Sequence, residues 1–230
     1  MSKTQLSNQD ILSCVDHTLL KPFATWGEIA ALCDEAVQNK VASVCVPPVY
    51  IRRIHDKYGD KLAICTVVGF PLGYNTTDAK LTEVRQAITD GASEIDMVIN
   101  ISDAKNGDFA KITAEISALK QECAKADPNS ILKVIIETCF LTDAEKIELC
   151  RCVTDAGAEY IKTSTGFGTN GATMEDVLLF KKHIGSAVKI KAAGGIKTRG
   201  DMVAFIEAGC SRLGTSSAIK ILHSETAEGY

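Results

Sequence analysis

Short apolar runs alternate along the whole chain with longer segments in which apolar residues recur at helical spacing. The segment 26–39 is typical of the longer kind. The run 41–46 that follows it ends at Pro47 and Pro48, which can extend neither a helix nor a sheet. Continuous apolar runs of this kind predict buried parallel strands. Eight strands are predicted, at 15–18, 41–46, 62–68, 94–99, 131–137, 160–163, 188–192 and 212–214.

A helix is predicted after every strand, and one more helix before the first strand. Ser7, Thr142 and Thr173 each stand three residues before a carboxylate, which is the arrangement of a capping box at a helix N-terminus. The predicted helices are 7–13, 26–39, 49–58, 77–90, 109–126, 142–156, 173–184, 198–208 and a last one that starts near Ser216.

Strands and helices that alternate in this number predict one α/β domain over 1–230, folded as a single (β/α)8 TIM barrel. The segment 1–14 adds a short extra N-terminal helix, and the polar segment 224–230 is expected to be a mobile C-terminal tail. An open doubly wound sheet is the competing architecture. In dinucleotide-binding sheets a GxGxxG sequence follows the first strand. No such sequence follows the first predicted strand of this chain, which favours the barrel.

A weak internal repeat relates three strands of this barrel. In each copy a glycine ends a helix and the chain then enters a strand, at 90–96, 156–162 and 208–214. Asp96, Lys162 and Gly214 occupy the last position of the three copies. We therefore expect them at equivalent places near the C-terminal ends of their strands, which is the face where barrel enzymes carry their active sites.

Composition and charge restrict the partners. A hydrophobic fraction of 46% and a net charge of −4 are ordinary for a globular domain and give no broad basic surface, so nucleic acid is not expected to bind. The nine cysteines form no CxxC pair, which favours reduced thiols and a cytoplasmic location. No signal-peptide core and no apolar run of membrane-spanning length occurs, so no membrane partner is expected.

Charged residues within the predicted strands are the first chemical signal, because strands covered on both faces should be apolar. Buried charges are costly unless they are paired, so a group of them indicates a functional interior. Some could instead point into the seams between strands and helices. The residues concerned are Asp16, Asp96, Lys133, Glu137, Lys162, Lys189 and Lys191.

Lys162 is the predicted nucleophile. A lysine attacks a carbonyl only when it is neutral, and a nearby cation or burial favours the neutral amine. Lys191 on the next strand can supply that cation, since adjacent strands lie about 4.8 Å apart. Asp96 can relay protons through a water molecule. Lys189 lies two residues deeper than Lys191, and we assign it to structure.

Glycine loops after the last two strands predict a phosphate site. Residues 193–196 and 213–217 both lead into helices, and glycines let backbone N–H groups approach an anion. The loops after strands 7 and 8 are the usual phosphate position in such barrels. Each loop alone could be an ordinary turn.

Several other residues are weaker candidates. Asp16 and His17 could bind a substrate hydroxyl or form a buried structural pair, and Cys45 is expected to be a small apolar filler. The four histidines show no metal-ligand spacing, so neither a metal nor another cofactor is predicted. Tyr230 ends the polar tail, and a solvated terminus is its simplest interpretation.

Six segments in the same order give the chain a close resemblance to the deoxyribose-phosphate aldolase family, from about Ser13 to Leu222. They are DHTLLKP at 16–22, VVGFPLG at 67–73, EIDMV at 94–98, LKVIIET at 132–138, IKTSTG at 161–166 and KAAGG at 191–195. Tyr230 matches a C-terminal tyrosine that some members carry.

The resemblance implies a class I lyase that reversibly cleaves 2-deoxy-D-ribose 5-phosphate to D-glyceraldehyde 3-phosphate and acetaldehyde, in carbohydrate and deoxyribonucleotide catabolism. It implies a Schiff base on Lys162, proton transfer by Asp96 with water, tuning by Lys191, and a substrate hydroxyl oriented by Asp16. It also suggests a homodimer. The residues implied to hold the phosphate are Gly166, Gly194, Gly195, Gly214, Ser216 and Ser217.

One position departs from part of the family. Some members have a lysine directly after the TSTG sequence that helps to bind the phosphate, whereas this chain has Phe167. Lys197, after the paired glycines, is the residue that we expect to compensate.

Two other functions fit the same strand residues. A sugar-phosphate isomerase or epimerase would use a carboxylate base and a metal, with Lys162 as a salt-bridge partner. A non-catalytic barrel would only bind the sugar phosphate. Covalent trapping at Lys162 by borohydride, with acetaldehyde present, distinguishes the aldolase from both.

Overall fold

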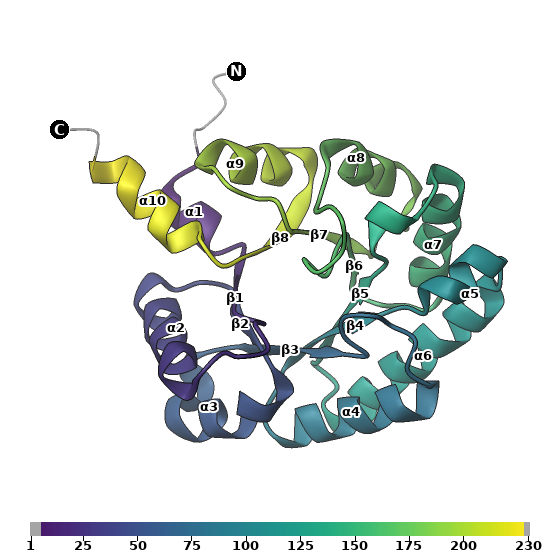
Figure 1. Cartoon of the computed structure of the whole chain (residues 1–230), viewed down its shortest axis with the longest axis horizontal. Coiled ribbons are helices and arrows are strands. Elements are labelled where there is room, and N and C mark those ends of the chain that lie inside the picture. Colours follow the sequence, from purple (N-terminus) through teal and green to yellow (C-terminus); the bar gives the residue numbers. More distant parts are fainter. Residues whose placement is uncertain (1–5, 228–230) are drawn as a thin grey trace.

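The computed structural model describes residues 6–227. In these residues strands and helices alternate as predicted, and the strands close into a barrel (Figure 1). The eight strands are parallel and pair in chain order, and the last strand pairs with the first. The (β/α)8 fold is therefore confirmed, and the open sheet is excluded. The strands are β1 Val15–Thr18, β2 Ser43–Val46, β3 Ile64–Val68, β4 Glu94–Val98, β5 Ile131–Ile135, β6 Tyr160–Lys162, β7 Lys189–Ala193 and β8 Cys210–Thr215.

The helices form a ring around the strands (Figure 1). The N-terminal helix α1 lies against α9 and α10, beside the junction of β8 and β1. One helix, α5, was not predicted, because its single polar turn has no apolar periodicity. The helices are α1 Asn8–Leu12, α2 Trp26–Asn39, α3 Ile51–Tyr58, α4 Thr77–Thr89, α5 Ile101–Asn106, α6 Phe109–Ala126, α7 Asp143–Asp155, α8 Met174–His183, α9 Arg199–Ala208 and α10 Ala218–Ala227.

Local capping explains where most of these helices begin. Ser7 and Thr142 form the expected capping boxes with Asp10 and Glu145, which satisfies backbone N–H groups that the first turn leaves without a partner. At Thr173 the prediction is half correct. Its hydroxyl accepts the N–H of Asp176, but that carboxylate pairs with a lysine of α7 instead of completing the box.

The C-terminal boundary differs from the prediction. Helix α10 continues to Ala227, so residues 224–227 are helical where we had expected the tail to begin, and the mobility of this segment stays a prediction. Within this stretch, the Ser224 hydroxyl donates to the Lys220 carbonyl at 2.9 Å. Tyr230 lies outside the described residues. No described helix combines the length and apolar character that a bilayer span requires.

The side chains of each strand divide between two environments. In β4, Ile95 and Met97 pack outward into the apolar layer between the strands and the helices. Glu94 and Asp96 alternate with them and point into the barrel, as the period of two in a strand requires. The seam with the helices is therefore the hydrophobic core, and much of the barrel interior is charged.

Candidate active site

A cavity of about 330 Å³ opens at the C-terminal ends of the strands. Four loops contribute to its wall, those after β1, β6, β7 and β8, and Lys162 at the end of β6 contributes from the barrel interior. Every residue that the family resemblance implied for the phosphate lies on this wall. The lining residues are Thr18, Leu19, Leu20, Lys21, Lys162, Thr165, Gly166, Phe167, Ala193, Gly194, Gly195, Ile196, Gly214, Thr215, Ser216 and Ser217.

Lys162 connects this cavity to a buried charge network. Its side chain is 4% exposed, and its amine donates to Oδ2 of Asp96 at 2.6 Å. The Lys191 amine contacts the same carboxylate oxygen at 2.7 Å. The expected approach of the two lysines is therefore mediated by Asp96, which lies between their nitrogens. The repeat correctly placed Asp96 and Lys162 together.

Asp96 is the centre of the network. Its second oxygen, Oδ1, accepts from the amine of Lys133 at 3.0 Å and from the thiol of Cys65 at 3.1 Å. Burial alone would raise the pKa of this carboxyl, but the ammonium groups of Lys133, Lys162 and Lys191 outweigh burial and hold its pKa well below the ordinary value. In the resting protein Asp96 is therefore a carboxylate.

Asp16 is the second carboxylate of this network. It is fully buried below the cavity and does not line it. Its carboxylate accepts from Lys191, Arg212 and Ser43, the last at 2.9 Å. Burial raises its pKa, but the cations Lys191, Lys133 and Arg212 more than offset burial and lower the pKa. Its oxygens are engaged with these partners and hold Lys191, so the structure shows no contact surface for a substrate hydroxyl.

A second layer of charges lies beneath Asp96. The Lys133 amine contacts Glu94 at 2.6 Å, and the Arg212 guanidinium binds Glu94 with both terminal nitrogens at 2.8 and 3.0 Å. Arg212 also stands 6.0 Å from the ring centroid of Tyr160. We had no role for these residues. The internal repeat could have indicated that they lie close together, because Glu94, Tyr160 and Arg212 occupy the same position in its three copies.

Two of the buried lysines keep their protons. Burial lowers the pKa of Lys191, but Asp16 and Asp96 raise it above the ordinary value by a larger amount. For Lys133, burial is likewise outweighed, mainly by Asp96, and the pKa lies well above normal. Both groups are therefore fixed cations at neutral pH.

The same geometry bears on metal binding. Two sets of donors, one around Cys45 and one around Glu94, have atoms within 4.8 Å of one another, and both include Cys65. The Lys133 amine lies between the carboxylates of Glu94 and Asp96 and contacts the Cys65 sulfur at 3.2 Å. A protonated lysine thus takes the position of a cation among these groups.

Acid should weaken the network in a defined range. Because the folded-state pKa of Asp16 is lowered, its ion pairs stabilise the fold fully above the unfolded pKa of about 3.9 and lose that effect as pH falls from there toward the folded pKa. We expect the stability difference between wild type and Asp16→Asn to shrink by about 1 kcal/mol between pH 5 and pH 3. Urea unfolding at both pH values measures it. A constant difference would show that Asp16 titrates alike in the folded and unfolded chains.

The phosphate loops have the backbone that a close approach requires. Gly166, Gly194 and Gly195 have φ angles of 86°, 79° and 76°, in the left-handed region that favours glycine. At Gly214 a Cβ atom would stand 3.0 Å from the Cβ of Ala193 and 3.3 Å from the Lys191 side chain. A side chain there would crowd the cavity floor.

Glu137 fixes the loop after β6 from the neighbouring strand. It is 2% exposed, adopts a left-handed φ of 55°, and accepts from both the backbone N–H and the hydroxyl of Thr165. The Thr165 hydroxyl in turn accepts the N–H of Phe167 at 3.0 Å. A buried carboxylate in an uncommon backbone conformation thus holds the segment that follows Lys162. We had noted Glu137 as a strand charge without assigning it a role.

The remaining candidates have structural positions. His17 points outward to Glu35 on α2 at 3.1 Å, which agrees with the structural alternative. Lys189 is exposed, and its amine stands 5.7 Å from the ring centroid of Tyr160. Cys45 is fully buried in a small apolar cluster with Cys65 and Val67 inside the barrel. Lys197 does not line the cavity.

Comparison with known proteins gives one consistent result. A family model described as DeoC/LacD family aldolase matches residues 11–216. The deoxyribose-phosphate aldolase of Clostridium botulinum (strain Alaska E43 / Type E3) is 60% identical over 98% of this chain and 100% of its own length. That of Clostridioides difficile (strain 630) is 55% identical over 96% of this chain and 99% of its own length.

Solved structures agree with the sequence matches. The tetrameric deoxyribose phosphate aldolase from Aeropyrum pernix superposes with a TM-score of 0.89, at 31% identity, over 96% of this chain and 93% of its own. An aldolase named QR15 gives a TM-score of 0.87 at 35% identity, over 95% of this chain and 97% of its own.

Proposed function

Because this chain belongs to the DeoC/LacD family of aldolases, we propose that it reversibly cleaves 2-deoxy-D-ribose 5-phosphate to D-glyceraldehyde 3-phosphate and acetaldehyde. The observation that carries this proposal is the position of Lys162. Its amine is the one member of the buried charge network that lines the cavity, and it is the group that a substrate carbonyl can reach. The enzyme is then a class I lyase that works through a Schiff base.

The reaction follows from this placement. The neutral Lys162 amine adds to the C1 carbonyl of the open-chain sugar, and water leaves to give the protonated imine. The C3 hydroxyl loses its proton, the C2–C3 bond breaks, and its electron pair moves into the enamine. D-Glyceraldehyde 3-phosphate departs. The enamine takes a proton at C2, and water hydrolyses the imine to acetaldehyde and the free amine.

The charge network suits Lys162 for this attack. Four cationic groups, Lys133, Lys162, Lys191 and Arg212, stand against three carboxylates, Asp16, Glu94 and Asp96, so the cluster carries one positive charge in excess. Loss of one proton balances the cluster. Lys162 is the member that lines the cavity and can meet the substrate carbonyl, while Lys133 and Lys191 are held as cations.

We assign proton transfer to Asp96, with a water molecule that reaches the cavity from its carboxylate. Its contact with Lys162 places it beside the proton that the amine loses, and the cations Lys133 and Lys191 keep Asp96 a carboxylate, so the proton passes on to the water. Asp16 acts through Lys191 and is a positioning residue. Lys191 stands as a fixed cation on the other side of Asp96, and we assign to it the tuning of this site.

Covalent trapping tests the proposal. Incubation with acetaldehyde and sodium borohydride should reduce the imine to an N-ethyl lysine and add about 28 Da to the peptide that carries Lys162. An isomerase or a non-catalytic binder would remain unmodified at this residue. Absence of the adduct, or an adduct on other lysines alone, would contradict the Schiff-base mechanism.

We also infer that the enzyme works in the cytoplasm. All nine cysteines are free thiols, and seven of them are buried, as expected in a reducing compartment. The homodimer that the family resemblance suggested stays a prediction. The tetrameric state printed for the Aeropyrum pernix enzyme belongs to that protein.

A further inference from the structure

The charges around the cavity are unequally distributed. Its lining includes two ammonium groups, Lys21 and Lys162, and no carboxylate. The wall formed by the loops after β7 and β8 offers neutral donors, namely backbone N–H groups and the hydroxyls of Ser216 and Ser217. A sugar phosphate carries close to two negative charges at neutral pH, and neutral donors cannot cancel them.

Lys162 cannot serve as the counter-charge for the phosphate. During the proposed reaction its nitrogen is bonded to the substrate carbon, at the end of the sugar opposite the phosphate. Its other contact is with Asp96. Lys21 is therefore the remaining cation among the lining residues.

Lys21 is available for this role. It lies in the loop between β1 and α2, which is anchored where the Leu19 N–H donates to the Cys45 carbonyl at 3.0 Å and the Ala24 N–H donates to the Lys21 carbonyl at 3.0 Å. The Lys21 side chain is exposed, with its amine 5.8 Å from the ring centroid of Phe23. Over residues 6–227, no carboxylate lies within salt-bridge distance of this amine.

The acidic residues that flank Lys21 in sequence, Asp16 and Glu28, are both already engaged, Asp16 with Lys191 and Arg212. Glu28 accepts from the backbone N–H of Thr25 at 2.7 Å and from its hydroxyl at 2.8 Å, as part of the cap of α2. The ammonium of Lys21 feels the charge of Glu28 but forms no ion pair with it at contact distance, so there is no such pair to break at the cavity. Binding an anion would cost it little beyond the ordering of its side chain.

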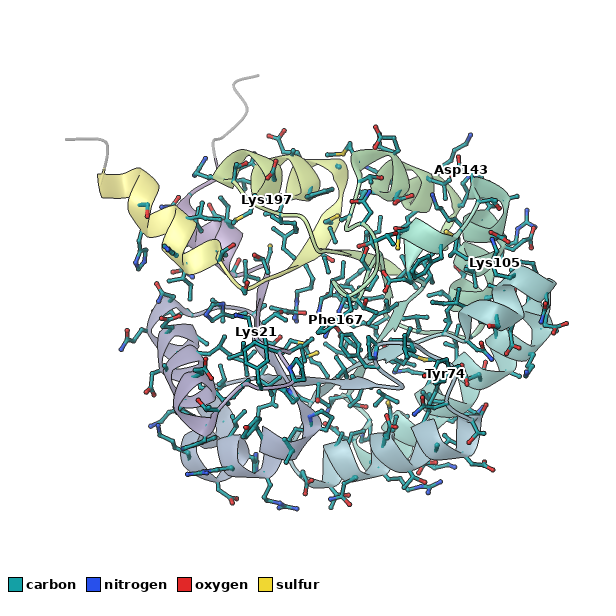
Figure 2. The ribbon with its side chains drawn as sticks, viewed as in Figure 1. Lys21, Tyr74, Lys105, Asp143, Phe167 and Lys197 are labelled. Atoms are coloured by element: carbon teal, nitrogen blue, oxygen red, sulfur yellow. The ribbon has the colours of Figure 1, made fainter. Side chains whose placement is uncertain are left out.

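Two other positions could have supplied the charge, and neither does. Phe167 lines the cavity as an apolar wall, packed edge-on against Phe70 with ring centroids 5.3 Å apart. Lys197, which we had expected to compensate, lies farther from the barrel axis near α9, whereas Lys21 and Phe167 lie close to that axis (Figure 2). The backbone N–H of Lys197 donates to the capping carboxylate of Asp201 at 3.0 Å.

We propose that Lys21 is the residue that selects phosphorylated substrates, by placing its ammonium against a phosphate held on the glycine loops after β7 and β8. The proposal rests on the aldolase function proposed above and adds a specificity-determining residue to it. It replaces Lys197 in that role.

Kinetics of Lys21→Met with two substrates test this assignment. For 2-deoxy-D-ribose 5-phosphate we expect KM to rise about 10- to 100-fold, the usual effect of losing one charge-assisted hydrogen bond, with kcat changed less than about threefold. Cleavage of unphosphorylated 2-deoxy-D-ribose should keep its rate. Lys21→Arg should restore most of the affinity, and the matched control Lys197→Met should leave KM unchanged.

The outcomes separate this proposal from the one it rests on. An unchanged KM in Lys21→Met would overturn the role of Lys21. An equal loss of activity with the phosphorylated and the unphosphorylated sugar would also overturn it, because that result indicates a loop with an altered conformation. A rise in KM in Lys197→Met alone would return the role to that residue. Borohydride trapping of acetaldehyde at Lys162 should persist in Lys21→Met. Its failure in the wild type would instead contradict the aldolase mechanism.

Discussion

Lys162→Ala should lose at least about four orders of magnitude in kcat for cleavage of 2-deoxy-D-ribose 5-phosphate, because no other amine lines the cavity at the carbonyl end of the substrate. The fold should survive the change. Alanine removes a side chain that is 4% exposed, together with one cation from a cluster that carries an excess of positive charge. Steady-state rates and circular dichroism measure the two effects.

Lys189→Ala is the matched control for this loss. Lys189 lies on the neighbouring strand, but its side chain is exposed and takes no part in the charge network. Its activity should remain within about twofold of wild type, as is usual for exposed positions. Substantial residual activity in Lys162→Ala, or borohydride trapping at Lys191 in that variant, would show that a second amine can form the Schiff base.

Asp96→Asn should lower kcat by about two to four orders of magnitude, the usual contribution of a positioned acid–base group. An amide of the same shape cannot accept the proton that Lys162 releases. It also leaves the ammonium groups of Lys133 and Lys191 with less negative charge nearby. We therefore expect a stability loss of about 3 kcal/mol in addition, as for a buried ion pair that loses one partner.

Two measurements separate these effects. Urea unfolding reports the stability loss, and single-turnover rates at a temperature where both proteins are folded report the chemistry. Asp103→Asn is a suitable control. It also removes a largely buried carboxylate with a lysine partner, Lys111 at 2.9 Å, but on the helical side of the barrel. Equal rate losses in the two variants would contradict a specific role of Asp96 in proton transfer.

Much of this site followed from the sequence, because charge within a buried strand has few explanations. The period of two placed Asp96, Lys162 and Lys191 in the barrel interior, and the repeat placed the first two together. The phosphate site was predicted from where the glycine loops stand in the chain. They follow the last two strands, and the loops after those strands meet at one end of any such barrel.

The partners of these charges could not be predicted, because they depend on how the strands are staggered. Lys191 reaches Asp16 across the closure of the barrel, and the register between β7 and β8 shifts at Ile190/Lys191. A shift of this kind leaves no mark in the pattern of apolar residues. For the same reason Lys133 was visible as a charge but had no assigned partner, and Arg212 was not singled out.

Loop residues were the least predictable part. Lys21 lies beyond the end of β1 in a segment without periodicity, and only the folded chain shows that it lines the cavity. Lys197 was the better guess from sequence, because it closely follows the paired glycines, but in the folded chain it does not line the cavity.

The ion pairs of Asp16 set the order in which this enzyme matures. Asp16 joins Lys191 and Arg212 across 175 and 196 residues, so the earliest strand waits for the last ones. A ribosome releases Lys162 well before it releases either partner. The charge network around Lys162 is therefore complete only once β7 and β8 are in place and the barrel has closed.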